Sequence, residues 1–130
     1  METGNLVSGL AHIGLPTDDM AKTLEFYEGL GFEIVMETVN EAADEKVAFV
    51  RFKGVMLEIY ENKQAAMKAD AIDHIAFDVT DVRAVFESLK AGGYELLDDK
   101  VQFLPFWDNG VEFFTILGPN KEKLEFCQKL

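Results

Sequence analysis

The sequence repeats one order of segments twice, and this repeat limits the folds that the chain can adopt. Each half opens with a strand-like run that contains a histidine, continues through an Asp-containing cap into an apolar-faced helix, and reaches a glycine. Further strand-like runs follow, and each half closes on a glutamate between apolar residues. The pattern predicts an α+β fold of two paired βαβββ modules, at 8–61 and 72–128, within one domain over 1–130.

In the first half, residues 10–15 predict a strand that Pro16-Thr17-Asp18 ends, and these residues also supply a helix N-cap. Ala21, Leu24, Tyr27 and Leu30 recur at helical spacing, and Gly31 is the expected stop. Strands are predicted at 32–36, 47–52 and 55–60, and the polar 37–46 is predicted to be a loop. Lys53-Gly54 favours a hairpin in which Phe49 lies opposite Glu58.

The second half follows the same order. A strand at 72–79 leads to a cap at Thr80-Asp81 and a helix with an apolar face, which Gly92-Gly93 ends. Strands are predicted at 94–97, 111–117 and 124–128, with turns at 108–110 and 118–120. The stretch at 101–107 is rich in aromatic residues. The predicted helix face consists of Val82, Val85, Phe86 and Leu89.

Composition narrows the partners. The 130 residues carry 24 acidic and 12 basic side chains, so the net charge of −12 disfavours nucleic acid and anionic membranes as partners. Met1 to Leu6 lacks the pattern of a signal peptide, and no apolar run reaches the roughly 18 residues that a membrane span needs. Cys127 is the single cysteine. We therefore expect an intracellular, cytoplasmic protein without an internal disulfide.

Two histidines and two glutamates occupy matching places in the repeat. His12 and Glu58 are 46 residues apart, and His74 and Glu125 are 51 apart. A carboxylate inside an apolar strand is costly without a partner. Side chains alternate across a strand, so each His and Glu can share one concave face. Imidazole nitrogen and carboxylate oxygen suit Ni²⁺, Co²⁺, Zn²⁺, Mn²⁺ or Fe²⁺, and the four residues predict a divalent metal site.

The chain resembles a known family at several of these places. The His-Ile strand starts, the helix end at Phe26-Tyr27-Glu28-Gly29-Leu30-Gly31-Phe32 and the closing Leu124-Glu125-Phe126 are similar to the vicinal oxygen chelate superfamily, glyoxalase I in particular. The resemblance covers roughly 8–128. It implies the fold shared by glyoxalase, bleomycin resistance protein and dihydroxybiphenyl dioxygenase, a metal on His12, Glu58, His74 and Glu125, and a homodimer whose metal lies within one chain or between two.

The activity that the resemblance implies is that of a lyase of the lactoylglutathione lyase type. A metal with two open positions would chelate neighbouring substrate oxygens and stabilise an enediolate. A glutamate from the ligand set would take the proton, and we favour Glu125 over Glu58. Bacterial glyoxalase I carries an arginine that binds glutathione where this chain has Pro16, whereas its asparagine four residues after the first Glu is matched here by Asn62. The resemblance therefore does not decide which thiol the substrate contains.

Several residues are candidates for binding a small-molecule substrate. The hairpin register places Phe49 and Arg51 on the Glu58 face, where Arg51 would bind a carboxylate or phosphate unless it is an ordinary surface residue. Asn62 joins them through the resemblance. Phe103 and Trp107 would wall an apolar pocket or else pack in the core.

Three other functions compete with the lyase. A metal-dependent epimerase or isomerase would enolise an acyl-thioester or hydroxyketone, although methylmalonyl-CoA epimerases typically have glutamine where Glu58 stands. Extradiol dioxygenases use two His and one Glu, and a fourth ligand would crowd their open positions. A binding protein of the bleomycin or fosfomycin resistance type would not need the full ligand set. The four ligands together favour metal chemistry.

Overall fold

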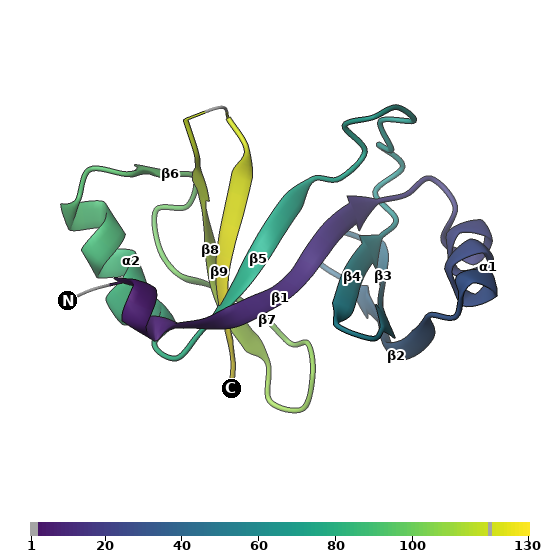
Figure 1. Ribbon diagram of the computed structural model, residues 1–130, viewed down its shortest axis with the longest axis horizontal. Coiled ribbons are helices and arrows are strands. Elements are labelled where there is room, and N and C mark those ends of the chain that lie inside the picture. The colour runs from purple at the N-terminus through teal and green to yellow at the C-terminus, as the bar shows by residue number, and fades with distance from the viewer. Residues whose placement is uncertain (1–2, 120) are drawn as a thin grey trace. The chain divides into compact units, whose positions relative to one another are not determined.

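The computed structural model describes residues 3–119 and 121–130, and the chain divides into two compact units. We call His12–Asp73 the His12 unit. We call His74–Leu130, together with the N-terminal residues up to Ala11, the His74 unit. Each unit contains one helix of the predicted pair and one histidine with its glutamate (Figure 1).

The His12 unit is a small sheet covered on one face by a helix. It contains the end of β1 (Val7–Pro16), α1 (Met20–Leu30), β2 (Glu33–Asn40), β3 (Glu45–Phe52) and β4 (Val55–Tyr60). The strand order is β2-β3-β4-β1, in which β1 and β4 are parallel and the other neighbours are antiparallel. Helix and sheet enclose a core made of Met20, Leu24, Ala48, Val50, Leu57 and Ile59.

Helix α1 begins one residue later than the sequence predicted. Its N-cap is Asp19, whose Oδ1 accepts from the Lys22 amide at 3.1 Å, so the cap predicted at 16–18 was wrong by one position. Gly31 ends the helix with φ of 110°, as expected for a residue without a Cβ. The predicted apolar face was partly wrong. Met20 and Leu24 are buried, but Ala21 and Leu30 are exposed, because the stripe that faces the sheet is narrow.

The predicted loop at 37–46 was also wrong for most of its length. Strand β2 continues to Asn40 and β3 starts at Glu45, which pair with each other across a short turn. Within this unit β2 lies at the edge of the sheet, and its residues 37 and 39 are exposed. An edge strand with one solvated face tolerates polar residues, so its sequence carries no strong strand pattern.

The His74 unit repeats this arrangement and adds one further strand, β7, to its sheet. It contains β5 (His74–Val79), α2 (Val82–Ala91), β6 (Glu95–Leu96), β7 (Gln102–Leu104), β8 (Val111–Leu117) and β9 (Lys123–Lys129). Its strand order is β5-β9-β8-β6, and β7 also pairs with β8. Strands β5 and β9 are parallel, as β1 and β4 are. Helix α2 packs against β8 and β9 (Figure 1).

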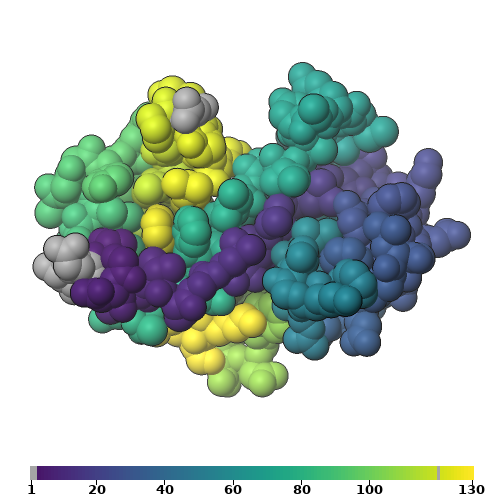
Figure 2. Space-filling view, in the orientation of Figure 1, coloured from purple at the N-terminus to yellow at the C-terminus, as the bar shows by residue number. Residues whose placement is uncertain are grey.

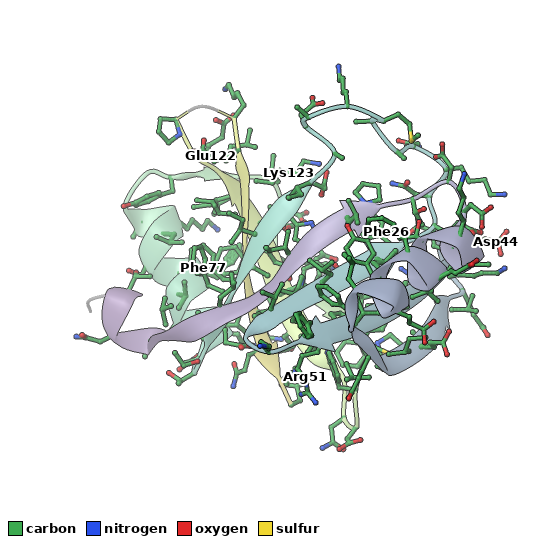
Figure 3. All side chains as sticks on the ribbon, turned by 45° about the vertical axis from the view of Figure 1, so that its right-hand side comes forward. Phe26, Asp44, Arg51, Phe77, Glu122 and Lys123 are labelled. Atoms are coloured by element: carbon green, nitrogen blue, oxygen red, sulfur yellow. The ribbon has the colours of Figure 1, made fainter. Side chains whose placement is uncertain are left out.

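The core of the His74 unit confirms the predicted face of α2. Val82, Val85, Phe86 and Leu89 are all buried, with Phe114, Ile116 and Phe126 from the sheet opposite them. Phe77 of β5 packs on the same cluster, among the side chains between α2 and the sheet (Figure 3). Asp81 is the N-cap, and its side chain accepts from the Ala84 amide at 3.1 Å.

One strand prediction in this half was wrong in extent, because only Glu95–Leu96 of 94–97 is β-strand, while 111–117 was correct. The aromatic-rich stretch at 101–107 contains β7, Gln102–Leu104, which was not predicted. Asp98 explains why β6 ends at Leu96. Its Oδ2 accepts from the Thr115 amide at 2.7 Å and so replaces a strand-to-strand bond. The turn predicted at 118–120 includes Asn120, which lies outside the described residues.

The N-terminal segment belongs to the His74 unit. Its 3-10 helix η1 (Thr3–Leu6) and the first residue of β1, Val7, pack beside α2, and the Thr80 amide donates to the Leu6 carbonyl at 2.9 Å. Within the described residues, no helix has the length and apolarity needed to cross a membrane.

Candidate metal centre

His12 and Glu58 form a close pair in the His12 unit. The Nε2 atom of His12 lies 3.3 Å from Oε1 of Glu58, and the two side chains are 9% and 14% exposed. Glu58 lies opposite Gly14 of β1, two residues after His12, so alternation puts both side chains on one face. The apolar neighbours Leu57 and Ile59 point to the opposite face, into the α1 core.

His74 and Glu125 repeat this geometry in the His74 unit. The Nε2 atom of His74 lies 3.6 Å from Oε1 of Glu125, and the side chains are 10% and 13% exposed. Glu125 lies opposite Ala76, which is again two residues after the histidine. Distance, burial and register therefore agree between the two pairs, as the repeat in the sequence predicted for each half.

Phe49 packs against the His12 ring and restricts it. Phe49 is 2% exposed and meets His12 edge to face, with 5.4 Å between ring centroids. Its position opposite Glu58 confirms the predicted hairpin register. In the His74 unit the residue opposite Glu125 on β8 is Thr115. The position of Thr115 follows from the β8–β9 register and has no local signal in the sequence.

The structure adds a tyrosine and an aspartate beside the His12–Glu58 pair. Tyr60 follows Glu58 by two residues and shares its face of β4, and its side chain is hydrogen-bonded to Asp73. Burial is the main reason that the pKa of the Tyr60 phenol is raised, and Asp73 and then Glu58 raise it further. The phenol therefore stays protonated and acts as a hydrogen-bond donor. Sequence alternation could have placed Tyr60 on this face, but nothing local identified Asp73 as its partner.

Two predicted substrate residues of the His12 unit lie at its surface or in a turn. Arg51 is opposite Met56 and two residues from Phe49, so its strand position is on the Glu58 face, and its side chain is exposed (Figure 3). Asn62 serves a local turn, since its Oδ1 accepts from the Gln64 amide at 2.9 Å. It belongs to the irregular segment between β4 and β5, which protrudes as a teal mass in Figure 2.

Of the two aromatic candidates of the His74 unit, Phe103 lies on the face away from Glu125. Phe103 pairs with Glu112 of β8, whereas Glu125 pairs with Thr115, so Phe103 and Glu125 are on opposite faces of the sheet. Phe103 is 54% exposed and covers Gly110, where a Cβ would clash with its ring. Trp107 is half-buried, and the Lys129 Nζ lies 3.8 Å from the centre of its ring.

Cys127 extends the Glu125 face by one step. It is 3% exposed, pairs with Asp78 and Phe113, and its Sγ lies 4.0 Å from Oδ1 of Asp78. Cys127 is therefore a packed thiol.

Comparison with known proteins identifies the family. The model of the Glyoxalase/Bleomycin resistance protein/Dioxygenase superfamily matches residues 9–126, nearly the whole chain. The chain belongs to this superfamily. The vicinal oxygen chelate fold predicted from the sequence is confirmed, and members of the superfamily are typically enzymes that bind small molecules and often a divalent metal.

Individual relatives of this superfamily member are distant. The uncharacterized protein YwbC of Bacillus subtilis (strain 168) is 25% identical over 123 residues, which cover 91% of this chain and 95% of that protein. Methylmalonyl-CoA epimerase of Streptomyces coelicolor, solved with 2-nitronate-propionyl-CoA, superposes with a TM-score of 0.77 at 23% identity, covering 95% and 98% of the two chains.

Two further structures show the same fold. The methylmalonyl-CoA epimerase of Mycobacterium tuberculosis has a TM-score of 0.78 at 19% identity, with 100% of this chain and 93% of that one covered. A hypothetical protein from Bacillus halodurans C-125 has a TM-score of 0.75 at 21% identity and covers 93% and 94%. At these identities the solved structures show that the fold is shared.

The donor set of this superfamily member fits a divalent metal. Each unit offers one imidazole nitrogen and one carboxylate oxygen within 3.6 Å of each other, on side chains that are at most 14% exposed. Mixed nitrogen and oxygen donors of this kind suit first-row divalent ions. A buried carboxylate beside a histidine would gain charge compensation from such an ion.

Proposed function

We propose that His12, Glu58, His74 and Glu125 together bind one divalent metal, and that the protein catalyses proton transfer at a carbon next to a carbonyl. The observation that carries the proposal is the doubled pair: two His–Glu contacts of 3.3 and 3.6 Å in the same strand register, one in each unit. One pair alone would have an ordinary structural explanation. Two pairs with matching burial support a ligand set with two carboxylates that neutralise a divalent charge.

A hydrogen bond within the His12 unit holds the residue that precedes His74. The Asp73 amide donates to the Gly14 carbonyl at 2.8 Å, and Gly14 is the residue opposite Glu58. His74 follows Asp73 directly in the chain. The residue before His74 is therefore anchored to β1 within the His12 unit. Whether one chain or two supply the four ligands is decided by the mixing experiment described in the Discussion.

The proposed reaction uses a glutamate as the proton carrier. A bound divalent ion would supply Lewis-acid stabilisation of negative charge on two neighbouring substrate oxygens. Glu125 takes the proton from the carbon between the thioether sulfur and the carbonyl, and the same carboxyl returns it to the adjacent carbon. The hydroxyl proton of the first carbon passes to the former carbonyl oxygen of the second. The two shifts together convert the hemithioacetal of methylglyoxal into a hydroxyacyl thioester, with no other reactant consumed. Glu58 occupies the matching place in the His12 unit and is the alternative base.

A second reaction is favoured by the similarity to methylmalonyl-CoA epimerases over 95% of this chain. In this second reaction one carboxylate would remove the proton next to a thioester carbonyl. A second acid would return a proton to the opposite side of the same carbon. Glu58 and Glu125, as two carboxylates of equal burial, could share these roles. Both reactions need the same metal site and the same first step. They differ in where the proton is returned.

The substrate site that we propose includes the Glu58 face, with Phe49 as a wall against the His12 ring. Arg51 remains a proposed contact for a carboxylate or phosphate at the exposed end of that face. Phe103 is left out, since its register places it on the face away from Glu125. A homodimer and a cytoplasmic location also remain proposals.

The test is an exchange experiment in D₂O. Metal-free protein is loaded separately with Ni²⁺, Co²⁺, Zn²⁺, Mn²⁺ and Fe²⁺ and given methylglyoxal hemithioacetals of several thiols or methylmalonyl-CoA. We expect metal-dependent product formation with one substrate class, and proton NMR reports where deuterium enters. Absence of product and of exchange across all metals and substrates, in protein shown to bind the metal, would reject the proposed reactions and leave a binding protein.

A further inference from the structure

His74 stands at the start of a strand, whereas His12 stands in the middle of one. His12 lies in the middle of β1, a ten-residue strand, so regular strand structure holds the residues on both sides of it. His74 is the first residue of β5 and follows the irregular segment at 61–73. A ligand at the start of a strand needs some other restraint, because irregular backbone has more freedom to lose.

The residue before His74 is held by two hydrogen bonds of the His12 unit. The Asp73 amide donates to the Gly14 carbonyl at 2.8 Å, and the Asp73 carboxylate accepts from the Tyr60 hydroxyl. Tyr60 is itself fixed, since its carbonyl accepts from the amides of Thr17 at 2.9 Å and Asn62 at 3.1 Å. The residue at the matching place before His12 is Ala11, which has no carboxylate.

We propose that Tyr60 and Asp73 form a positioning pair that fixes His74 as a metal ligand. The pair does not coordinate the ion. It holds the peptide unit that enters His74, so that the imidazole meets the other ligands without a further loss of backbone freedom on binding. This inference rests on the proposed metal site and adds to it two residues that the family resemblance did not supply.

The Tyr60 hydroxyl is the donor in its hydrogen bond with Asp73, because the carboxylate of Asp73 offers acceptor oxygens. Phenylalanine preserves the ring and its packing but removes the donor, so Tyr60→Phe isolates the hydrogen bond from the aromatic contact.

The experiment measures metal affinity directly. Titration of metal-free protein with Co²⁺, followed by the visible absorption of the bound ion and by calorimetry, gives the Kd and a spectrum that reports ligand geometry. Loss of a residue that orients a ligand typically weakens metal binding 10- to 100-fold. We expect Tyr60→Phe to raise the Kd for Co²⁺ about tenfold and to alter the spectrum.

Matched variants separate this effect from general damage. Tyr27→Phe removes the hydroxyl of another half-buried tyrosine in the same unit and should leave the Co²⁺ Kd and spectrum unchanged. Asp73→Ala should weaken binding to a similar degree as Tyr60→Phe. In the double variant the second change should add little, because both act through one hydrogen bond. Circular dichroism and thermal unfolding check that each variant is folded.

The outcomes distinguish this inference from the proposed function. Wild-type protein that binds no divalent ion refutes the metal site itself. Wild-type binding with an unchanged Kd and spectrum in folded Tyr60→Phe refutes only the positioning pair. Fully additive losses in the double variant also refute the pair, since Tyr60 would then act without Asp73.

Discussion

Removing His74 provides the most direct test of the proposed metal site. His74→Ala deletes one nitrogen donor that lies 3.6 Å from Glu125 and leaves the strand β5 otherwise intact. Because metal binds the folded state, the site should be visible as a metal-dependent rise in the thermal unfolding midpoint. The measurement therefore compares each variant with itself, with and without Co²⁺.

The size of the effect follows from binding linkage and chain length. At a metal concentration 100 times Kd, binding stabilises the folded state by about 2.7 kcal/mol. For 130 residues the entropy of unfolding is about 270 cal/mol/K, so the wild-type Tm should rise by about 10 °C. A variant that binds 100-fold more weakly keeps only about 0.4 kcal/mol at the same concentration, or about 1.5 °C.

The assay is differential scanning fluorimetry of EDTA-treated protein with a Co²⁺ series, supported by elemental analysis of the protein as purified. Ser88→Ala is the control, since Ser88 is a partly buried hydroxyl of α2 in the same unit and is outside the His–Glu pairs. Its metal-dependent shift should match that of wild type. A full shift of about 10 °C in His74→Ala would show that the ion binds elsewhere and would refute the ligand assignment.

Three further predictions test the base, the chain arrangement and the core. Glu125→Gln should slow metal-dependent deuterium exchange at least about 100-fold, measured by NMR at saturating metal, and a larger loss in Glu58→Gln would reverse the assignment. If two chains share each site, mixing unfolded His12→Ala and His74→Ala chains and refolding them should recover about a quarter of wild-type metal sites, because only one site of each mixed dimer is intact. Sites confined to one chain would recover none. Phe114→Ala should lower the free energy of unfolding by about 3–5 kcal/mol in urea titrations, since Phe114 is 0% exposed in the α2 core, and a loss below about 1 kcal/mol would contradict that packing.

The repeat was readable from the sequence because helix and strand periods differ. The spacing of Val82, Val85, Phe86 and Leu89 matched a helix face, and all four are buried. The Lys53-Gly54 turn fixed the β3–β4 register, so Phe49 could be placed opposite Glu58 without coordinates. Such features depend on a few neighbouring residues, which is why local reasoning succeeds for them.

The polar edge strand β2 and the exact ends of strands could not be predicted from the local sequence. Strand β2 extends to Asn40 because β3 pairs with it, although residues 37–40 are mostly polar. The strand predicted at 94–97 is shorter in the structure, because Asp98 accepts a hydrogen bond from the Thr115 amide, 17 positions further along the chain. In both places tertiary pairing overrode the pattern of the segment itself.

For the candidate metal centre, the sequence by itself determined the donors. It showed two histidines and two glutamates in matching frames, and alternation along each strand already put the glutamates on the face away from their apolar neighbours. Only the tertiary structure decided the contacts: how close each His lies to its Glu, which face Phe103 occupies, and that Tyr60 is hydrogen-bonded to Asp73. The reason is physical, since side-chain contacts depend on strand register and on loop paths, which are set by packing across the whole unit.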